Sequence, residues 1–423
     1  MASVLSDRAG PDTSGPAGLG AGAIARLVRD GRATATDVAQ AHLTRTADLD
    51  RRVDAFRAVD PERVLAEAAG VDVRPGRFAL PLAGVPVAVA EDIAVAGFAT
   101  GHPFGPGSDP ARRDDVLVRR LRAAGAVVVG TTRTPALGVA GPAGQRCRCG
   151  GGPVAVAAGM AALALGTDGS GTLRLAAAQC RLVALKPGRG AVPVAGGTDE
   201  LWFGLAETAA VGRTAADTAL MFEALSAGTV GDLAAVGIPR RVAVSLRNPA
   251  GRERPDAAPH DAVRIAARRF AEHGVQTVEA DPPYPGGLNR DWTRRWRAGL
   301  ARQADDLGVT DLHGQARSAV RRGRRGLRSG PPRETVASTW RDRLTGWLDG
   351  GRYDVLVLPV AGGPSRRPGP AARAPHLQAW NLAGLPAVVV PVRWGASRAP
   401  VQLVGRPGSE AMLLATAACL ERE

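Results

Sequence analysis

A glycine-rich stretch in the middle of the chain, GTDGSGTLR, carries the side chains best suited to chemistry. Thr172 carries a hydroxyl that could attack a substrate, although its methyl group crowds the approach. Backbone N–H groups in such a loop can polarise a carbonyl group or hold an anion. Asp168, Gly169, Ser170, Gly171 and Arg174 surround Thr172 in this stretch. Ser170 could also act as a displaced nucleophile, but nothing visible in the sequence activates it.

Two other segments carry reactive side chains. Glu91 and Asp92 follow an apolar run and are candidate general bases or acids, of which at most one faces a pocket if the strand continues through them. Cys149 is a further candidate nucleophile, because the arginines beside it and Cys147 can lower the thiol pKa values; inert thiols are the plainer interpretation. Two cysteines without a second pair or a nearby histidine make no zinc site, so neither metal nor cofactor is expected.

The elements that must position these residues alternate between helices and strands. Apolar runs bounded by Pro or Gly predict buried strands at 81–92, 353–360 and 385–392. Helix–strand units are predicted at 114–132 and 261–280, where Gly125 and Gly274 stop the helices. Helices are expected across 20–70, with Thr34 or Thr36 as an N-cap. The run VAVAAGMAALAL has no polar face and predicts a buried helix over 150–165. Together these patterns predict an α/β fold with a parallel or mixed sheet.

Composition is that of an ordinary globular chain of 423 residues with 45% hydrophobic residues. No run of eighteen apolar residues exists, so no membrane span is expected. The N-terminus has neither a basic region nor an apolar core of a secretory signal, and residues 1–18 read as a mobile arm. Four cysteines make no disulfide framework in a chain of this length, which favours the cytoplasm.

The net charge of +14 comes almost entirely from arginine, because Lys186 is the only lysine. This skew indicates coding bias in a GC-rich genome rather than selection for a charged partner. Aromatic residues are only 4%, so platforms for stacking bases are scarce and nucleic acid is not the expected partner. The Arg-dense segment 290–335 is interpreted as a solvated helical face. The alternatives are a basic lid over a pocket or a docking surface for anions.

The segment 155–187, AVAAGMAALALGTDGSGTLRLAAAQCRLVALKP, closely resembles the signature sequence of the amidase-signature family. Further similar segments occur in the family's order: PLAGVPVAVAEDIAVAG, RRLRAAGAVVVGTT, RTAADTALMFEAL and NLAGLPAVVVPV. The resemblance implies a mixed central β-sheet flanked by α-helices on both faces. It also implies a single domain over residues 19–423, with a variable Arg-rich insert at about 236–352.

The resemblance also identifies where the catalytic residues should stand. Family members use a Ser nucleophile, a bridging Ser on a cis peptide and a neutral Lys. The matching positions here are Thr172, which is the candidate nucleophile, Arg148 and Ala90, so all three have changed. The resemblance also implies that Asp168, Gly169, Ser170, Gly171 and Arg174 form the loop that binds the substrate. A guanidinium cannot take a proton and Ala90 removes the base, so the family's hydrolytic mechanism is expected to be absent. Lys186 belongs to the Leu-Lys-Pro element and is not expected to substitute.

Three functions are compatible with these residues. The first is a non-hydrolytic or repurposed enzyme, expected in a biosynthetic pathway, that binds an amide- or carboxylate-bearing small molecule, with Arg148 as a clamp for an anionic group. The second is an active amide hydrolase or acyl transferase using Thr172 or Cys149, with Glu91 or Asp92 as base. The third is a pseudoenzyme that binds a protein or nucleic acid through its basic surface. A homodimer is left open, and fold alone cannot choose among these functions.

Overall fold

The computed structural model describes residues 15–102, 104–105, 109–138, 150–196, 200–226, 228, 230–250, 257–360, 374–394 and 397–421. Within these residues, the centre is an 11-stranded sheet with the order β1-β3-β2-β4-β6-β5-β10-β11-β9-β7-β8. Its strands are β1 (Phe56–Val59), β2 (Pro86–Ala90), β3 (Val127–Thr132), β4 (Leu163–Asp168), β5 (Val183–Lys186), β6 (Glu207–Gly212), β7 (Arg241–Val244), β8 (Gln276–Glu279), β9 (Val355–Pro359), β10 (Ala387–Trp394) and β11 (Ser397–Val404).

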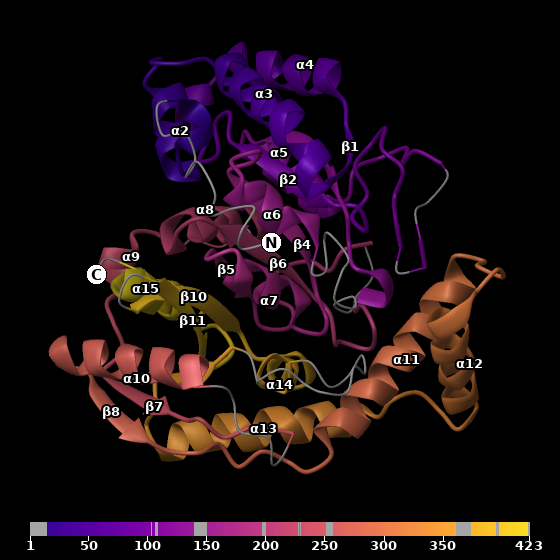
Figure 1. Cartoon of the computed structure of the whole chain (residues 1–423), viewed down its shortest axis with the longest axis vertical. Helices are drawn as coiled ribbons and strands as arrows, with labels where there is room; N and C mark the ends of the chain where they lie inside the picture. Colours follow the sequence, from indigo (N-terminus) through magenta and orange to yellow (C-terminus); the bar gives the residue numbers. More distant parts are fainter. Residues whose placement is uncertain are drawn as a thin grey trace.

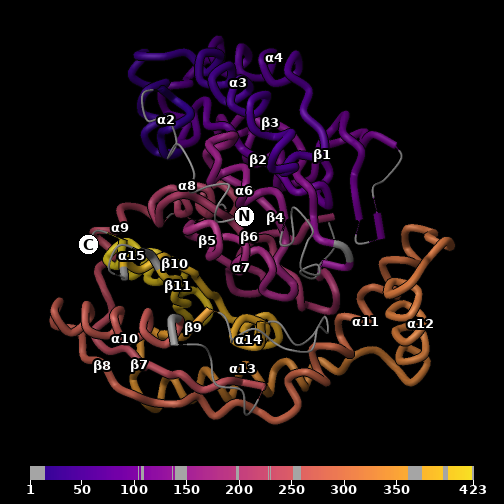
Figure 2. Tube along the Cα trace, viewed as in Figure 1, coloured from indigo at the N-terminus to yellow at the C-terminus, as the bar shows by residue number. Residues whose placement is uncertain are grey.

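The sheet is mixed. Strands β3, β2 and β4 run parallel to one another, as do β9, β7 and β8. The strands between these two groups pair antiparallel, so that β10 lies between β5 and β11. The C-terminal strands therefore lie beside strands from the middle of the chain (Figure 2). Parallel neighbours need a crossover connection, and helices supply it in both parallel groups.

Helices cover both faces of the sheet (Figure 1). Along β9, Val355 and Val357 point into one hydrophobic cluster, whereas Leu356 and Leu358 point into another. This alternation follows from the two-residue period of a strand and gives the sheet two buried faces. The helices are α2 (Ala21–Arg29), α3 (Ala35–Val53), α4 (Pro61–Asp72), α5 (Val116–Ala123), α6 (Gly151–Ala157), α7 (Thr172–Gln179), α8 (Ala215–Ser226), α9 (Leu233–Val236), α10 (Ala257–Glu272), α11 (Leu288–Asp306), α12 (Gly314–Arg328), α13 (Glu334–Gly350), α14 (Pro375–Ala383) and α15 (Glu410–Glu421), with short 3-10 helices η1 (Pro16–Gly18), η2 (Arg77–Ala79) and η3 (Ala136–Gly138).

Several predicted element boundaries are confirmed. Thr34 caps α3 in a reciprocal capping box with Asp37. Gly125 and Gly274 have positive φ angles of 95° and 75°, and the strands β3 and β8 begin shortly after them. The α/β class and the mixed sheet flanked by helices are also confirmed.

The helix predicted over 150–165 is wrong beyond residue 157. Helix α6 ends there, Gly159 turns the chain with a φ of 77°, and strand β4 begins at Leu163. The whole segment is buried, so its apolar character reports burial correctly. An all-apolar run of small residues fits a buried strand as well as a buried helix, and Gly159 separates the two elements.

The structure describes only the last residues of the predicted N-terminal arm but most of the predicted insert. Residues 1–14 of the predicted arm lie outside the described residues. Its last residues form η1, where the Arg213 guanidinium donates hydrogen bonds to the carbonyls of Ala17 and Gly18. The segment 236–352 adds helices α10–α13 and also strands β7 and β8 of the sheet. The single-domain organisation stays a prediction.

Among the described residues, no helix has both the length and the apolar character that a membrane crossing requires.

Candidate active site

The glycine-rich stretch forms the tight connection between β4 and α7. Strand β4 ends at Asp168, and α7 begins at Thr172. Gly171 precedes the helix with a φ of 81°, and a Cβ atom there would lie 2.3 Å from the Cβ atom of Leu377. Glycine is therefore required twice over, by the left-handed backbone and by the close approach of α14.

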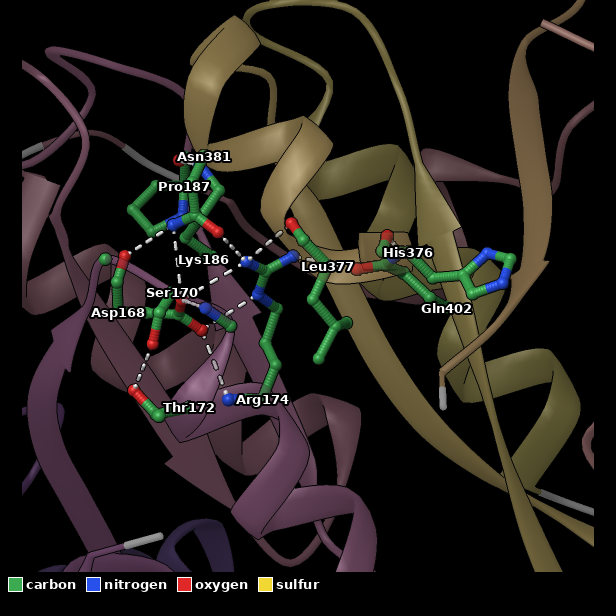
Figure 3. A network of polar contacts seen from close by, with 12 residues as sticks. Asp168, Ser170, Thr172, Arg174, Lys186, Pro187, His376, Leu377, Asn381 and Gln402 are labelled. Carbon is green, nitrogen blue, oxygen red and sulfur yellow. Dashed lines mark hydrogen bonds and ion pairs between the residues drawn. The ribbon is translucent and has the colours of Figure 1, made fainter. Parts of the chain in front are cut away.

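Asp168 and Arg174 form a buried ion pair behind this loop (Figure 3). The Arg174 Nε donates to Asp168 Oδ2 at 2.8 Å, and both side chains are 0% exposed. Asp168 Oδ1 accepts the Gly171 N–H at 2.7 Å, which fixes the turn. These hydrogen bonds indicate that Asp168 and Arg174 hold the loop in its shape. Their predicted contact with a ligand stays a prediction.

The remaining donors of Arg174 reach the C-terminal part of the chain. Nη1 donates to Gln402 Oε1 at 2.8 Å, and Nη2 donates to Asn381 Oδ1 at 2.6 Å. Asn381 Nδ2 in turn donates to the Asp168 carbonyl at 2.6 Å. Sequence reasoning missed Asn381 and Gln402. The available signal was one amide side chain in each of two apolar runs, NLAGLPAVVVPV and APVQLV.

Two hydroxyl groups meet at the start of α7. Ser170 Oγ lies 3.3 Å from Thr172 Oγ1 and donates to the Gly138 carbonyl at 2.9 Å. Both side chains are buried, with exposures of 5% for Ser170 and 7% for Thr172. Thr172 and Gly169 line a cavity of about 50 Å³. This volume holds a few water-sized groups, since one water needs roughly 10–15 Å³.

The cavity brings together residues from distant parts of the chain. Ala90, the last residue of β2, and Asp92, two residues further on, lie at its wall. Trp202 and Gln303 lie there as well. Trp202 Nε1 donates to Gln303 Oε1 at 3.0 Å. Trp202 and Gln303 were not predicted as site residues. The described lining residues are Ala90, Asp92, Thr132, Arg133, Thr134, Pro135, Gly138, Gly150, Gly152, Leu165, Gly166, Thr167, Gly169, Thr172, Leu173, Leu201, Trp202, Ala206 and Gln303.

Of the two adjacent carboxylates, Asp92 lines this cavity and Glu91 does not. Asp92 Oδ2 accepts a hydrogen bond from Thr167 Oγ1 at 2.6 Å, whereas Oδ1 is buried without a partner among the described residues. Burial raises the pKa of Asp92 above its ordinary value, against the opposing effect of the Thr167 hydrogen bond. Glu91 instead accepts the Thr134 N–H at 2.8 Å. Strand β2 ends before both residues. The two side chains therefore point different ways because of a turn, and not because side chains alternate along a strand.

Helix α11 covers the glycine-rich loop. Trp292 Nε1 donates to the Gly169 carbonyl at 3.1 Å, and Trp296 Nε1 donates to the Leu137 carbonyl at 3.0 Å. The two indoles stack with centroids 5.6 Å apart. The Arg-rich segment is therefore more than a solvated face, because its buried side contacts the candidate site.

Other predicted residues lie elsewhere or are not described. Arg148 and Cys149 lie outside the described residues. Lys186 is fully buried, does not line the cavity, and donates to the Pro187 carbonyl at 2.6 Å. Burial lowers the pKa of Lys186, and the nearby Glu207 carboxylate opposes this effect.

Comparisons with known proteins agree with this architecture. The chain matches the family described as Amidase over residues 37–145 and 149–301. The putative amidase AmiB2 of Mycobacterium tuberculosis is 34% identical over 446 residues, which cover 95% of each chain. An acylamidase of Rhodococcus erythropolis is 28% identical, again over 95% of each chain.

A solved structure of 6-aminohexanoate cyclic dimer hydrolase complexed with substrate has the same fold. Its TM-score is 0.81 at 22% identity, and the match covers 96% of both chains. Similarity that extends through the sheet, the glycine-rich loop and most of the sequence leads to one conclusion: this chain belongs to the amidase family.

Proposed function

We propose that this protein binds an amide- or carboxylate-bearing small molecule in the cavity beside residues 168–172, without the family's Lys–Ser–Ser hydrolytic mechanism. The observation that supports the proposal is the absence of lysine from the described cavity wall, which Ala90 lines. The resemblance assigns Ala90 to the position of the family's lysine. The only lysine of the chain, Lys186, is fully buried and bound to the Pro187 carbonyl. A hydroxyl without a base is a poor nucleophile, so Thr172 lacks the activation that the family supplies.

Arg148 is the proposed clamp for an anionic group, on the sequence alone. A guanidinium beside the N–H groups of a glycine-rich loop suits a carboxylate, because charge and fixed dipoles act together. Replacing Arg148 with Ala should weaken propionate binding about ten- to hundredfold and leave propionamide nearly unchanged. Calorimetric titration of both ligands measures this difference. Equal losses for the two ligands would contradict the clamp.

One observation favours a second candidate, an active hydrolase with Thr172 as nucleophile. Asp92 lines the same cavity, and its raised pKa moves it toward the range useful in acid–base catalysis. The Ser170 hydroxyl lies 3.3 Å from Thr172 Oγ1 and could pass a proton.

An amide-hydrolysis assay with a fluorophosphonate label separates the two candidates. For the proposed function, aryl amides are not turned over above the uncatalysed rate and Thr172 is not labelled. Turnover that Thr172→Ala abolishes, while Thr339→Ala on the exposed face of α13 does not, would establish the hydrolase instead. The two substitutions remove the same atoms, so a loss confined to Thr172→Ala reports the site.

A further inference from the structure

A second cavity lies between α11 and α12, away from the candidate active site. Its volume is about 410 Å³, and it shares no lining residue with the cavity beside Thr172. Figure 1 shows the two helices side by side at the edge of the molecule. We call this cavity the arginine groove; its lining residues are Asn289, Arg290, Thr293, Arg294, Arg297, Ala298, Arg322, Gly323, Gly326, Gly330 and Pro332.

Helical spacing explains how one wall of the groove becomes basic. Arg290, Arg294 and Arg297 are separated by four and three residues, so they share one face of α11. Trp292 and Trp296 lie on the opposite face and hold the helix to the loops beneath it. The buried tryptophans therefore fix which face of α11 borders the groove.

Close packing of α12 brings a fourth arginine to the groove. A Cβ atom at Gly323 would lie only 2.0 Å from the Arg297 carbonyl oxygen, so the two helix backbones approach there as only glycine allows. Arg322 precedes this contact and lines the groove opposite α11. The contact places arginines of both helices along one groove.

The charges in the groove are not balanced. Among the residues that the structure describes, its wall carries four arginines and no carboxylate. Arg290 pairs with Asp291 at 3.0 Å, whereas Arg294, Arg297 and Arg322 form no ion pair with another described residue. Burial and the nearby charge of Arg322 both lower the pKa of Arg297. Like charges held close together repel, and a bound anion would relieve that repulsion.

We propose that the arginine groove binds the phosphate group of a small phosphorylated molecule. A phosphate monoester carries a charge of about −1.5 to −2 and three strong acceptor oxygens, which several arginine forks can share. The volume lies within the roughly 300–1,000 Å³ of small-molecule sites. None of the described lining residues is aromatic, so they offer nucleic-acid bases no stacking surface. A small ligand therefore fits better than a polynucleotide.

Calorimetric titration of the full chain with diphosphate and with inorganic phosphate tests this site. The test variant is Arg297→Gln with Arg322→Gln. The control is Arg325→Gln with Arg328→Gln, which removes the same charge from exposed residues of α12 outside the groove. We expect saturable diphosphate binding that the test variant weakens at least about tenfold and the control changes less than about twofold.

Three outcomes would overturn the proposal. Equal weakening by both variants would mean that net charge, not the groove, attracts the anion. Acetate that binds as tightly as phosphate at matched ionic strength, and depends equally on Arg297 and Arg322, would exclude a phosphate site. A single-stranded oligonucleotide that binds more tightly than diphosphate, and depends on Arg297 and Arg322, would assign the groove to nucleic acid. An unchanged urea midpoint for both variants ensures that each loss reports binding.

Discussion

The buried pair of Asp168 and Arg174 is the residue-scale feature on which the candidate site depends. Burial alone would raise the pKa of the Asp168 carboxyl, but the charge and hydrogen bonds of Arg174 hold that pKa below the ordinary 3.8. Two buried charges offset their desolvation only when their hydrogen bonds are satisfied. The amides of Asn381 and Gln402 accept bonds from the guanidinium and complete that arrangement.

Breaking this pair should be strongly destabilising. Asp168→Asn leaves the Arg174 guanidinium buried without its carboxylate, and we expect a loss of about 3–5 kcal/mol in the free energy of unfolding. Urea denaturation measures this loss. Asp305→Asn is the matched control, because Asp305 pairs with Arg324 at the surface and should cost about 0–1 kcal/mol. Similar values for the two variants would show that the buried pair contributes nothing special.

At this scale, the sequence could predict some residues of the candidate site and not others. Thr172 and Asp92 line the cavity, and the glycine-rich run identified the first of them. The resemblance to the amidase-signature family pointed to Ala90. Trp202 and Gln303 could not be foreseen, because their hydrogen bond joins residues 101 positions apart. Such contacts follow from the packing of α11, which no local pattern encodes.

At the scale of elements, local signals predicted boundaries well wherever glycine or a cap set them. Thr34, Gly125 and Gly274 stand where the structure begins or ends a helix. The failure at 150–165 has a physical cause. Small apolar residues carry no period that separates a buried helix from a buried strand. Gly159 was therefore the only sign in the sequence that one element ends and another begins.

Glycine also decides how closely α11 and α12 pack. A methyl group at Gly323 would meet the Arg297 carbonyl, so Gly323→Ala should separate the helices and lower the urea midpoint. Gly326 lies one turn on, and a Cβ atom there meets nothing within 4 Å. Gly326→Ala should therefore be neutral or stabilise by about 0.5–1 kcal/mol, as expected in a helix interior. A Gly323→Ala protein as stable as the Gly326→Ala protein would contradict the close packing.

For the whole molecule, two buried histidines make stability depend on pH. Burial lowers the pKa of His42 and of His376 to about 4, from the ordinary 6.5. The unfolded chain takes up these protons below pH 6.5, whereas the folded chain takes them up only near pH 4. The free energy of unfolding should therefore fall as the pH falls through this interval.

Thermal unfolding at pH 7 and at pH 4.5 checks this dependence. His42→Gln with His376→Gln should reduce the loss of midpoint between the two values, and His313→Gln should not, because His313 is 80% exposed. The comparison with the parent protein separates the histidines from Asp92 and Glu207, whose raised pKa values act in the opposite direction. Asp168 contributes only in more acidic solution, below its ordinary pKa of 3.8. An unchanged midpoint difference in the double variant would rule out the histidines.

The hydrogen bonds of Arg174 also determine when the loop can fold during synthesis. They join α7 to Leu377, Asn381 and Gln402, which follow it in the chain by 203, 207 and 228 residues. A ribosome releases the N-terminal part of a protein first, so β4 and α7 emerge long before the partners of Arg174 exist. The glycine-rich loop acquires its final shape only after β11 has left the ribosome. A nascent chain stalled before residue 374 would therefore carry the signature sequence without a finished site.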